Sequence, residues 1–153
     1  MADIISLLNY EEGFSAKPYY CSAGYPTIGI GQRIGPKGAP LKLYEFTVSK
    51  SLAAIWLAEK VKETLADMDK YENIRAAMAA CNEPRQAILI SMAYQMGAGG
   101  LAKFANTLKA ISEKRWSDAK SGMMNSAWAK QTPNRANRHA TQMLTGVWDQ
   151  EYK

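Results

Sequence analysis

The sequence is poor in the residues that build metal sites and disulfide frameworks. Its 153 residues include a single histidine and two cysteines. The cysteines, Cys21 and Cys81, lie far apart and form no CxxC pair, so we expect two reduced thiols. His139 has no second ligand-type residue beside it. A protein zinc site is therefore not expected.

Long apolar runs are missing as well. No stretch approaches the roughly 20 apolar residues that a membrane-spanning helix needs, so stable membrane insertion is not expected. The chain begins without a basic segment and soon reaches two acids, Glu11 and Glu12, a pattern unlike that of a secretory signal peptide. The apolar content of 47% is ordinary for a globular protein and argues against disorder. The length suits one domain, or two small lobes that share a core.

What the chain has is an excess of basic residues. There are 19 lysines and arginines against 14 acidic residues, which gives a formal net charge of +5. Such a protein is attracted to polyanions, including nucleic acids, anionic membranes and the bacterial envelope. The sequence shows no lysine and arginine cluster with interleaved aromatic residues. A nucleic-acid-binding domain is thus a weak alternative, and no nucleic acid partner is expected.

The first part of the chain predicts a short helix followed by strands. Ile4, Leu7 and Leu8 recur at helical spacing, which indicates an amphipathic helix over residues 3–12. Residues 13–38 are rich in glycine, proline, tyrosine and β-branched side chains, which favours strands joined by turns. We therefore expect a β-rich lobe over residues 13–48.

The rest of the chain predicts helices. Residues 47–71 contain no glycine or proline, which predicts a long helix with a break near Ala66 and Asp67. We expect residues 49–71 to connect the β-rich lobe to a helical lobe made of residues 72–153 with 1–12. Short breaks are predicted at 82–84, 97–100, 122 and 132–133. The expected fold class is α+β, in one domain over residues 1–153.

One arrangement suggests chemistry. Glu12 ends the first predicted helix and is followed by a hairpin-like segment that can fold back over it. Glycosidic cleavage uses one carboxylic acid to protonate the leaving oxygen, and a second group on the opposite face to activate water or attack the anomeric carbon. A helix end that faces a β-turn can hold the acid and this second group on two walls of a cleft. A glutamate before a glycine is more often just a helix end, and Glu11 competes for the acid role.

The spacing of three residues is similar to that of a known family. Eight residues separate Glu12 from Cys21, and five separate Cys21 from Thr27. This resembles the Glu–Asp–Thr triad of the T-even phage lysozymes, glycoside hydrolase family 24, and GYPTIGIG at 24–31 looks like the strand after the triad turn. Residues 37–75 match the family only in pattern. Further matches follow in the family's order: AYQMG at 93–97, FANTL at 104–108, KRW at 114–116, QTPNRA at 131–136 and TGVWD at 145–149.

The resemblance implies roles for these residues. Glu12 matches the general acid, and Thr27 matches the threonine that helps to position the hydrolytic water. Cys21 stands where most relatives carry the aspartate that activates this water. The resemblance also implies a small antiparallel sheet lobe and a larger helical lobe joined by a long helix, with the cleft between the lobes. It implies supporting or substrate-binding roles for Gln95 and Thr132, which match residues lining the cleft, and for Arg135, which matches an arginine that pairs with the catalytic glutamate.

The sequence also departs from the family pattern. Gln32 stands where the best-known relatives have histidine, and Ala23 and Arg33 stand at cleft positions that carry glutamate and leucine. A free thiol such as that of Cys21 has a pKa of about 8.5 and is a poor base at neutral pH. A cation such as Lys17 would lower that pKa and give a thiolate that acts as base or nucleophile. The alternative is a half-buried apolar Cys21 in a degenerate enzyme, but because cysteine is an accepted variant in the family we expect activity.

The implied function is that of an endolysin that needs no metal or organic cofactor. The resemblance predicts a monomeric muramidase that cuts β-1,4 links between N-acetylmuramic acid and N-acetylglucosamine in bacterial peptidoglycan and so lyses the host. It would stay in the host cytoplasm until a holin releases it to the periplasm and cell wall. A transglycosylase and a catalytically dead peptidoglycan-binding module are the alternatives.

The tyrosines near Cys21 allow two interpretations, whereas the tryptophans indicate a structural role. Tyr19, Tyr20 and Tyr25 could stack on sugar rings or cover the sheet, and the sequence does not separate these roles. Trp116, Trp128 and Trp148 are expected to pack within the helical lobe.

Overall fold

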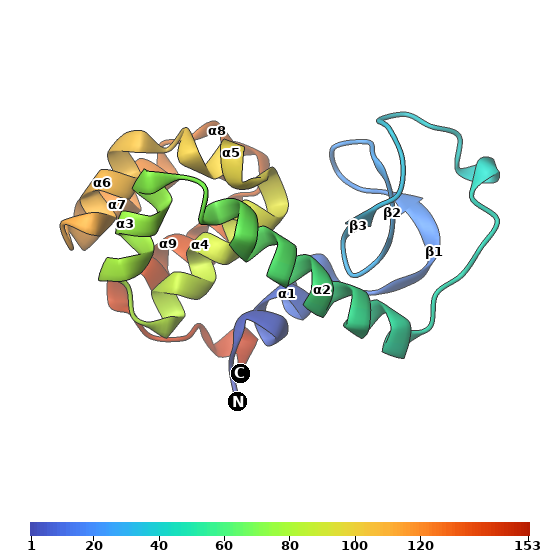
Figure 1. Ribbon diagram of the computed structural model, residues 1–153, viewed down its shortest axis with the longest axis horizontal. Helices are drawn as coiled ribbons and strands as arrows, with labels where there is room; N and C mark the ends of the chain where they lie inside the picture. Colours follow the sequence, from blue (N-terminus) through green and yellow to red (C-terminus); the bar gives the residue numbers. More distant parts are fainter. The chain divides into compact units, whose positions relative to one another are not determined.

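The computed structural model describes residues 1–153 as nine α-helices, two short 3₁₀ helices and one three-stranded sheet (Figure 1). The chain divides into two compact units, one made of residues 8–60 and the other of residues 1–7 with 61–153. We refer to them as the sheet unit and the helical unit. The α+β fold class predicted from the sequence is confirmed. None of the helices combines the length and the apolar character needed to cross a membrane.

The sheet unit is built on an antiparallel meander. The first helix, α1 (Ile4–Glu12), leads into β1 (Ser15–Tyr20), β2 (Pro26–Gly29) and β3 (Gln32–Arg33), and the strand order is β1-β2-β3. Tyr19 on β1 pairs with Thr27 on β2, and Thr27 pairs with Arg33 on β3. Side chains from all three strands thus lie in one row across the sheet.

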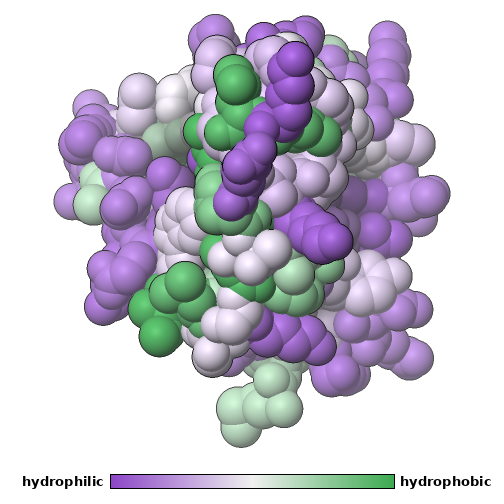
Figure 2. All heavy atoms as spheres, turned by 90° about the vertical axis from the view of Figure 1, so that its right-hand side faces the viewer, coloured by the Kyte–Doolittle hydropathy of each residue, from purple (hydrophilic) through white to green (hydrophobic).

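A long connection leads from the sheet to α2 (Lys50–Met68) and includes η1 (Leu41–Leu43). The backbone N–H of Val48 donates to the carbonyl of Ala16, with a donor–acceptor distance of 3.0 Å, which ties the connection to β1. Apolar side chains of the connection and of α2 remain exposed, and Figure 2 shows apolar groups among hydrophilic ones on this face. The most exposed are Leu43, Phe46, Leu52 and Ile55.

The helical unit surrounds α4 (Glu83–Met96) (Figure 1). Seven consecutive residues of α4, from 87 to 93, are buried, as expected of a helix that neighbours cover on every side. Asn82 caps its first turn by accepting from the backbone N–H of Arg85 at 3.2 Å, and Pro84 follows in the first turn, where proline is tolerated. The surrounding elements are α3 (Glu72–Ala80), α5 (Ala98–Ala102), α6 (Ala105–Ser112), α7 (Trp116–Met124), α8 (Ala127–Gln131), α9 (Pro133–Thr145) and η2 (Gln150–Tyr152).

Two predicted chain breaks are wrong, in part or in full. The break at 97–100 is confined to Gly97, whose φ of 82° ends α4, while Gly99 and Gly100 lie within α5. Gly122 lies inside α7 rather than at a break. A Cβ atom at Gly122 would overlap the hydroxyl oxygen of Thr107 on α6, so the glycine allows the two helices to approach closely. Its role is packing between helices and not the turn that the sequence indicated.

The long helix is shorter than predicted. Residues 47–71 were expected to be helical, but α2 begins at Lys50 and ends at Met68. It ends at the residue after Asp67, next to the predicted break near Ala66 and Asp67. The predicted helix ends at 82–84 and 132–133 are confirmed, where α4 begins at Glu83 and α9 at Pro133.

Candidate active site

Glu12 is the last residue of α1, and a turn of the sheet lies against its carboxyl group. Gly13 follows the helix, and its backbone N–H donates to the carbonyl of Asn9 at 3.1 Å while its φ is 66°. Gly31, in the turn between β2 and β3, is so close to Glu12 that a Cβ atom there would lie 2.6 Å from its Oε2 atom. The β2–β3 turn therefore restricts where the carboxyl group of the half-buried Glu12 can lie.

Cys21 lies in a tight turn between β1 and β2. Its backbone N–H donates to the carbonyl of Tyr25 at 3.0 Å, and its carbonyl accepts from the backbone N–H of Gly24 at 2.9 Å. Burial raises the pKa of the Cys21 thiol, but hydrogen bonds from the backbone of Tyr25 and Ala23 and from Thr27, together with the charge of Arg33, outweigh burial. The pKa of Cys21 is therefore lower than that of a free thiol, and at a given pH a larger fraction of Cys21 is thiolate than of a free cysteine.

Thr27 is buried on β2 and has one hydroxyl hydrogen to donate. Its Oγ1 atom lies 2.8 Å from the carbonyl oxygen of Tyr25 and also within reach of the Cys21 sulfur. The hydroxyl can donate to only one of these acceptors at a time. Donation to Cys21 is favoured when the sulfur is charged, because hydrogen bonds to charged acceptors are stronger.

Tyr19 connects the carboxyl group and the thiol. The pKa of its phenol is raised, first by burial and then by the negative charges of Glu12 and Cys21. Because both charges act on Tyr19, and because Thr27 pairs with it across the sheet, these four side chains form one cluster within the sheet unit. The sequence does not decide the role of Tyr19. Its place among Glu12, Cys21 and Thr27 follows from the pairing of β1 with β2.

The other predicted site residues lie in the helical unit, and two of them contact Trp128. The Oε1 atom of Gln95 accepts from the indole N–H of Trp128 at 2.8 Å, and the hydroxyl of Thr132 donates to the Trp128 carbonyl at 3.0 Å. Trp128 is buried, as predicted, and its ring packs edge-on against that of Phe104. The indole thus fixes the orientation of the Gln95 amide. The roles of Gln95 and Thr132 toward a saccharide stay predictions.

Arg135 begins a chain of buried polar groups. Its Nη2 atom donates to the Oγ atom of Ser91 at 2.9 Å, and this oxygen lies 2.7 Å from Nε2 of His139. The Nδ1 atom of His139 lies 3.1 Å from the hydroxyl of Tyr152. Since Arg135 can only donate, the Ser91 hydroxyl is left to donate to a neutral His139. The predicted pairing of Arg135 with the catalytic glutamate stays a prediction.

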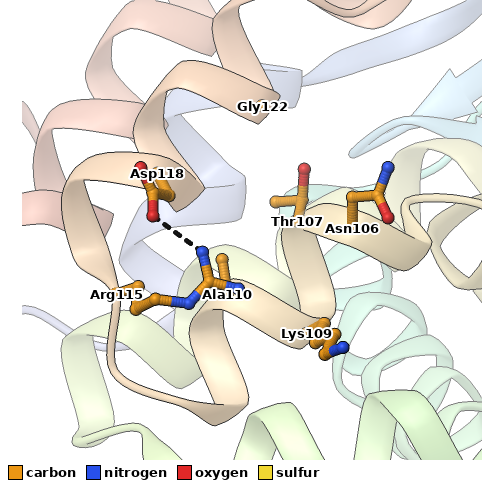
Figure 3. Close-up of a pocket in the computed structure, with 7 residues that line it drawn as sticks. All are labelled: Asn106, Thr107, Lys109, Ala110, Arg115, Asp118 and Gly122. Atoms are coloured by element: carbon orange, nitrogen blue, oxygen red, sulfur yellow. Dashed lines mark hydrogen bonds and ion pairs between the residues drawn. The ribbon is translucent and has the colours of Figure 1, made fainter.

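A pocket of the helical unit holds none of these residues. It has a volume of about 370 Å³ and lies between α6 and α7 (Figure 3). Arg115 at its rim donates to Asp118 at 2.7 Å and also pairs with Glu113. The charged groups at this pocket are thus already paired with each other on an exposed surface. Elsewhere in the chain, no group of three histidine, cysteine or acidic residues is placed to hold a metal ion.

Comparison with known proteins identifies the family. The model of the family described as phage lysozyme matches residues 9–145. The chain belongs to the phage lysozyme family. It is therefore a lysozyme, a glycoside hydrolase of the class that degrades peptidoglycan, and the resemblance noted in the sequence is confirmed.

Relatives differ in how much surrounds the shared region. Probable T4-type lysozyme 2 of Dictyostelium discoideum is 31% identical, and the match covers 100% of this chain and 99% of the relative. The pre-baseplate central spike protein Gp5 of Enterobacteria phage T4 is 33% identical over 92% of this chain, but only 27% of the relative is matched. Peptidoglycan hydrolase gp36 of Pseudomonas phage phiKMV is 30% identical over 86% of this chain and 14% of its own length.

The buried His139 gives this lysozyme a predicted acid sensitivity. Burial, followed by the charges of Arg135 and Arg138, lowers the pKa of His139 well below its usual range. Below about pH 6.5 the unfolded chain binds a proton on this residue and the folded chain does not. We expect the free energy of unfolding to fall by up to about 1.4 kcal/mol per pH unit as the pH drops below 6.5. Urea unfolding at pH 7.5, 6.5 and 5.5 measures this slope.

A variant and a spectrum separate His139 from other groups. The His139→Gln variant should show a shallower dependence on pH than the wild type, whatever its absolute stability. Because His139 is the single histidine, its imidazole proton resonances can be followed directly by NMR. They should not shift between pH 8 and 5.5 in the folded protein. A midpoint near pH 6.5 in the folded state would show that the neutral form is not favoured.

Proposed function

We propose that this lysozyme is a muramidase that hydrolyses the β-1,4 link between N-acetylmuramic acid and N-acetylglucosamine in bacterial peptidoglycan. The supporting observation is the cluster in the sheet unit, where a carboxyl group, a thiol of lowered pKa and a buried hydroxyl gather beside Tyr19. Such a cluster supplies the acid and the water-activating group that glycoside hydrolysis requires. The substrate fits the family and the name of one relative, a peptidoglycan hydrolase.

In the proposed reaction Glu12 is the general acid. It transfers its proton to the glycosidic oxygen as the bond to the anomeric carbon breaks. Thr27 holds a water molecule, which attacks the opposite face of that carbon while the Cys21 thiolate accepts the proton that the water loses. The reaction leaves a Glu12 carboxylate and a Cys21 thiol, and exchange with solvent restores both. The anomeric configuration is inverted.

A covalent route is a second candidate, because the same thiolate is also a nucleophile. Attack of the Cys21 sulfur on the anomeric carbon would form a thioglycosyl enzyme, which water then hydrolyses with Glu12 acting as base. The configuration would be retained. The lowered pKa of Cys21 favours a thiolate in both routes, so the stereochemistry of the product distinguishes them.

The remaining assignments extend this proposal. Gln95 and Thr132 would contact the saccharide, and Arg135 would support Glu12. The protein would act as a monomeric endolysin that a holin releases from the host cytoplasm to the cell wall, with no nucleic acid partner. Its net charge of +5 would help it to concentrate on the anionic wall.

Product analysis tests the proposed activity. Purified peptidoglycan is digested, and the soluble fragments are reduced and identified by mass spectrometry. A muramidase leaves reducing N-acetylmuramic acid ends, and NMR of the fresh products gives their anomeric configuration. Anhydro-sugar ends would instead indicate a transglycosylase. Sedimentation of the protein with intact walls, without released fragments, would indicate a binding module.

Gly31 is predicted to matter for activity through Glu12. In Gly31→Ala the added Cβ would lie 2.6 Å from Glu12 Oε2, so the flexible carboxyl group must move. A displacement of about 1 Å can reduce the rate about 10²-fold. We expect a loss of that size in the release of peptidoglycan fragments, with only the modest loss of stability, about 1–2 kcal/mol, that a left-handed backbone imposes on alanine.

Gly29, the last residue of β2 and two residues before Gly31, offers a matched control. Its φ of 65° is close to the 69° of Gly31, but a Cβ atom there would meet only Ala53 and Val48 at ordinary contact distances of 3.4 and 3.8 Å. Gly29→Ala should therefore lose similar stability and keep most of the activity. Equal losses of activity in the two variants would show that backbone strain, and not the position of Glu12, is responsible.

A further inference from the structure

Arg33 reaches the candidate site from β3. Its backbone pairs with Thr27 on the neighbouring strand. Its guanidinium lies over the ring of Tyr25, with 3.9 Å between the guanidinium carbon and the ring centroid. A stacked guanidinium is held in place even on an exposed surface, because the flat group and the aromatic face attract each other. Arg33 is therefore a fixed positive charge rather than a freely moving one.

Tyr25 is also the residue that closes the turn around Cys21. Its carbonyl accepts from the Cys21 backbone N–H at 3.0 Å, and its own backbone N–H donates to the Cys21 sulfur. The guanidinium of Arg33 thus stacks on the ring of Tyr25, and the backbone of Tyr25 is hydrogen-bonded to Cys21. Arg33 and Cys21 therefore both contact Tyr25.

The charged and titratable groups around Cys21 come from each neighbouring element of the sheet unit. Glu12 on α1 and Cys21 both act on the phenol of Tyr19 on β1. Tyr25 lies in the turn, and Arg33 on β3 stacks on its ring. Arg33 is the cation among these groups, and its charge favours the thiolate of Cys21.

We propose that Arg33 is a positioning residue for the reaction, because its guanidinium, stacked on Tyr25, favours the thiolate form of Cys21. This rests on the proposed role of Cys21 as base or nucleophile. A thiol is a weaker acid than a carboxylic acid and has to be ionised to take either role. Hydrogen bonds from the backbone of Tyr25 and Ala23 and from Thr27 stabilise the thiolate most, and the charge of Arg33 adds to them, in place of the Lys17 considered from the sequence.

The ionisation of Cys21 can be measured without any assay of activity. The folded protein is treated with iodoacetamide between pH 5 and 10, and mass spectrometry follows the peptide that contains Cys21, so that Cys81 does not interfere. In Arg33→Met we expect the rate at pH 7 to fall about two- to fivefold, the effect of an exposed charge pair. The rate at pH 10 should be unchanged, which shows that access to the sulfur is the same.

Two controls isolate the charge. Lys17→Met removes a positive charge from β1 of the same sheet and should leave the alkylation profile close to that of the wild type. In 1 M salt the difference between the wild type and Arg33→Met should shrink, because salt screens exposed charges. If Arg33→Met leaves the profile unchanged, or if Lys17→Met shifts it equally, the proposal is wrong.

Activity then tests the link to the reaction. In Arg33→Met the pH profile for release of peptidoglycan fragments should rise at higher pH than in the wild type, in step with the alkylation profile. In a Cys21→Asp background the same substitution should leave the pH profile nearly unchanged, since a carboxylate is ionised without help. If alkylation shifts but no variant releases fragments, the coupling of Arg33 to Cys21 stands and the proposed function fails.

Discussion

Replacing Glu12 with glutamine is expected to slow the release of peptidoglycan fragments about 10²- to 10⁴-fold, the usual contribution of a general acid. Glutamine keeps the size of the side chain and can occupy the same space beside Gly31. It has no proton to transfer to the glycosidic oxygen. The rate of fragment release from purified peptidoglycan measures the loss, and thermal unfolding shows that the variant remains folded.

Glu11 provides the matched control for this experiment. It is a carboxylate on the same final turn of α1 and was the competing candidate from the sequence. Glu11→Gln removes the same charge and should keep nearly the wild-type rate. If Glu11→Gln is the inactive variant, the acid has been assigned to the wrong neighbour. A Glu12→Gln protein as active as the wild type would remove Glu12 from the mechanism.

The second large effect is expected at Cys21. In Cys21→Ser the sulfur is replaced by a hydroxyl group, which does not ionise at neutral pH, so the water-activating base or nucleophile is lost. We expect the rate of fragment release to fall about 10²-fold or more. Cys21→Asp introduces a carboxylate that is ionised at neutral pH and should retain activity. The same release assay at pH 7 compares the three proteins.

Cys81 and the product configuration complete this test. Burial raises the pKa of Cys81 to about 11, so it is a neutral thiol at pH 7, and Cys81→Ser should leave the rate unchanged. Inverted products from both the wild type and Cys21→Asp would identify Cys21 as a base. Retained products from the wild type would identify it as a nucleophile. If only Cys21→Asp cuts walls that the wild type merely binds, the natural protein is a binding module on a lysozyme fold.

Much of the fold followed from local patterns in the sequence. Glycine and proline between residues 13 and 38 predicted a sheet with turns, and a three-stranded meander occupies that region. Breaks were predicted at 82–84 and 132–133, and α4 and α9 begin there, because proline is tolerated in a first helical turn and disfavoured inside a helix. These predictions succeeded because a residue's own backbone preferences decide them.

Glycines showed the limit of that approach. Gly97 ends a helix through its backbone conformation, as its sequence context indicated. Gly122 was interpreted in the same way, yet it lies within α7 because Thr107 of α6 leaves no room for a side chain. The neighbour that decides this position comes from another helix. A single sequence does not show which helices will touch.

The sequence by itself determined the family of this protein and the order of its candidate residues, since the spacing of Glu12, Cys21 and Thr27 is a property of the chain. Only the tertiary structure decided how these residues are surrounded. The approach of Gly31 to Glu12 and the stacking of Arg33 beside the Cys21 turn depend on how strands pair. The physical reason is that charge, burial and close approach act through space, between groups that the folded chain brings together.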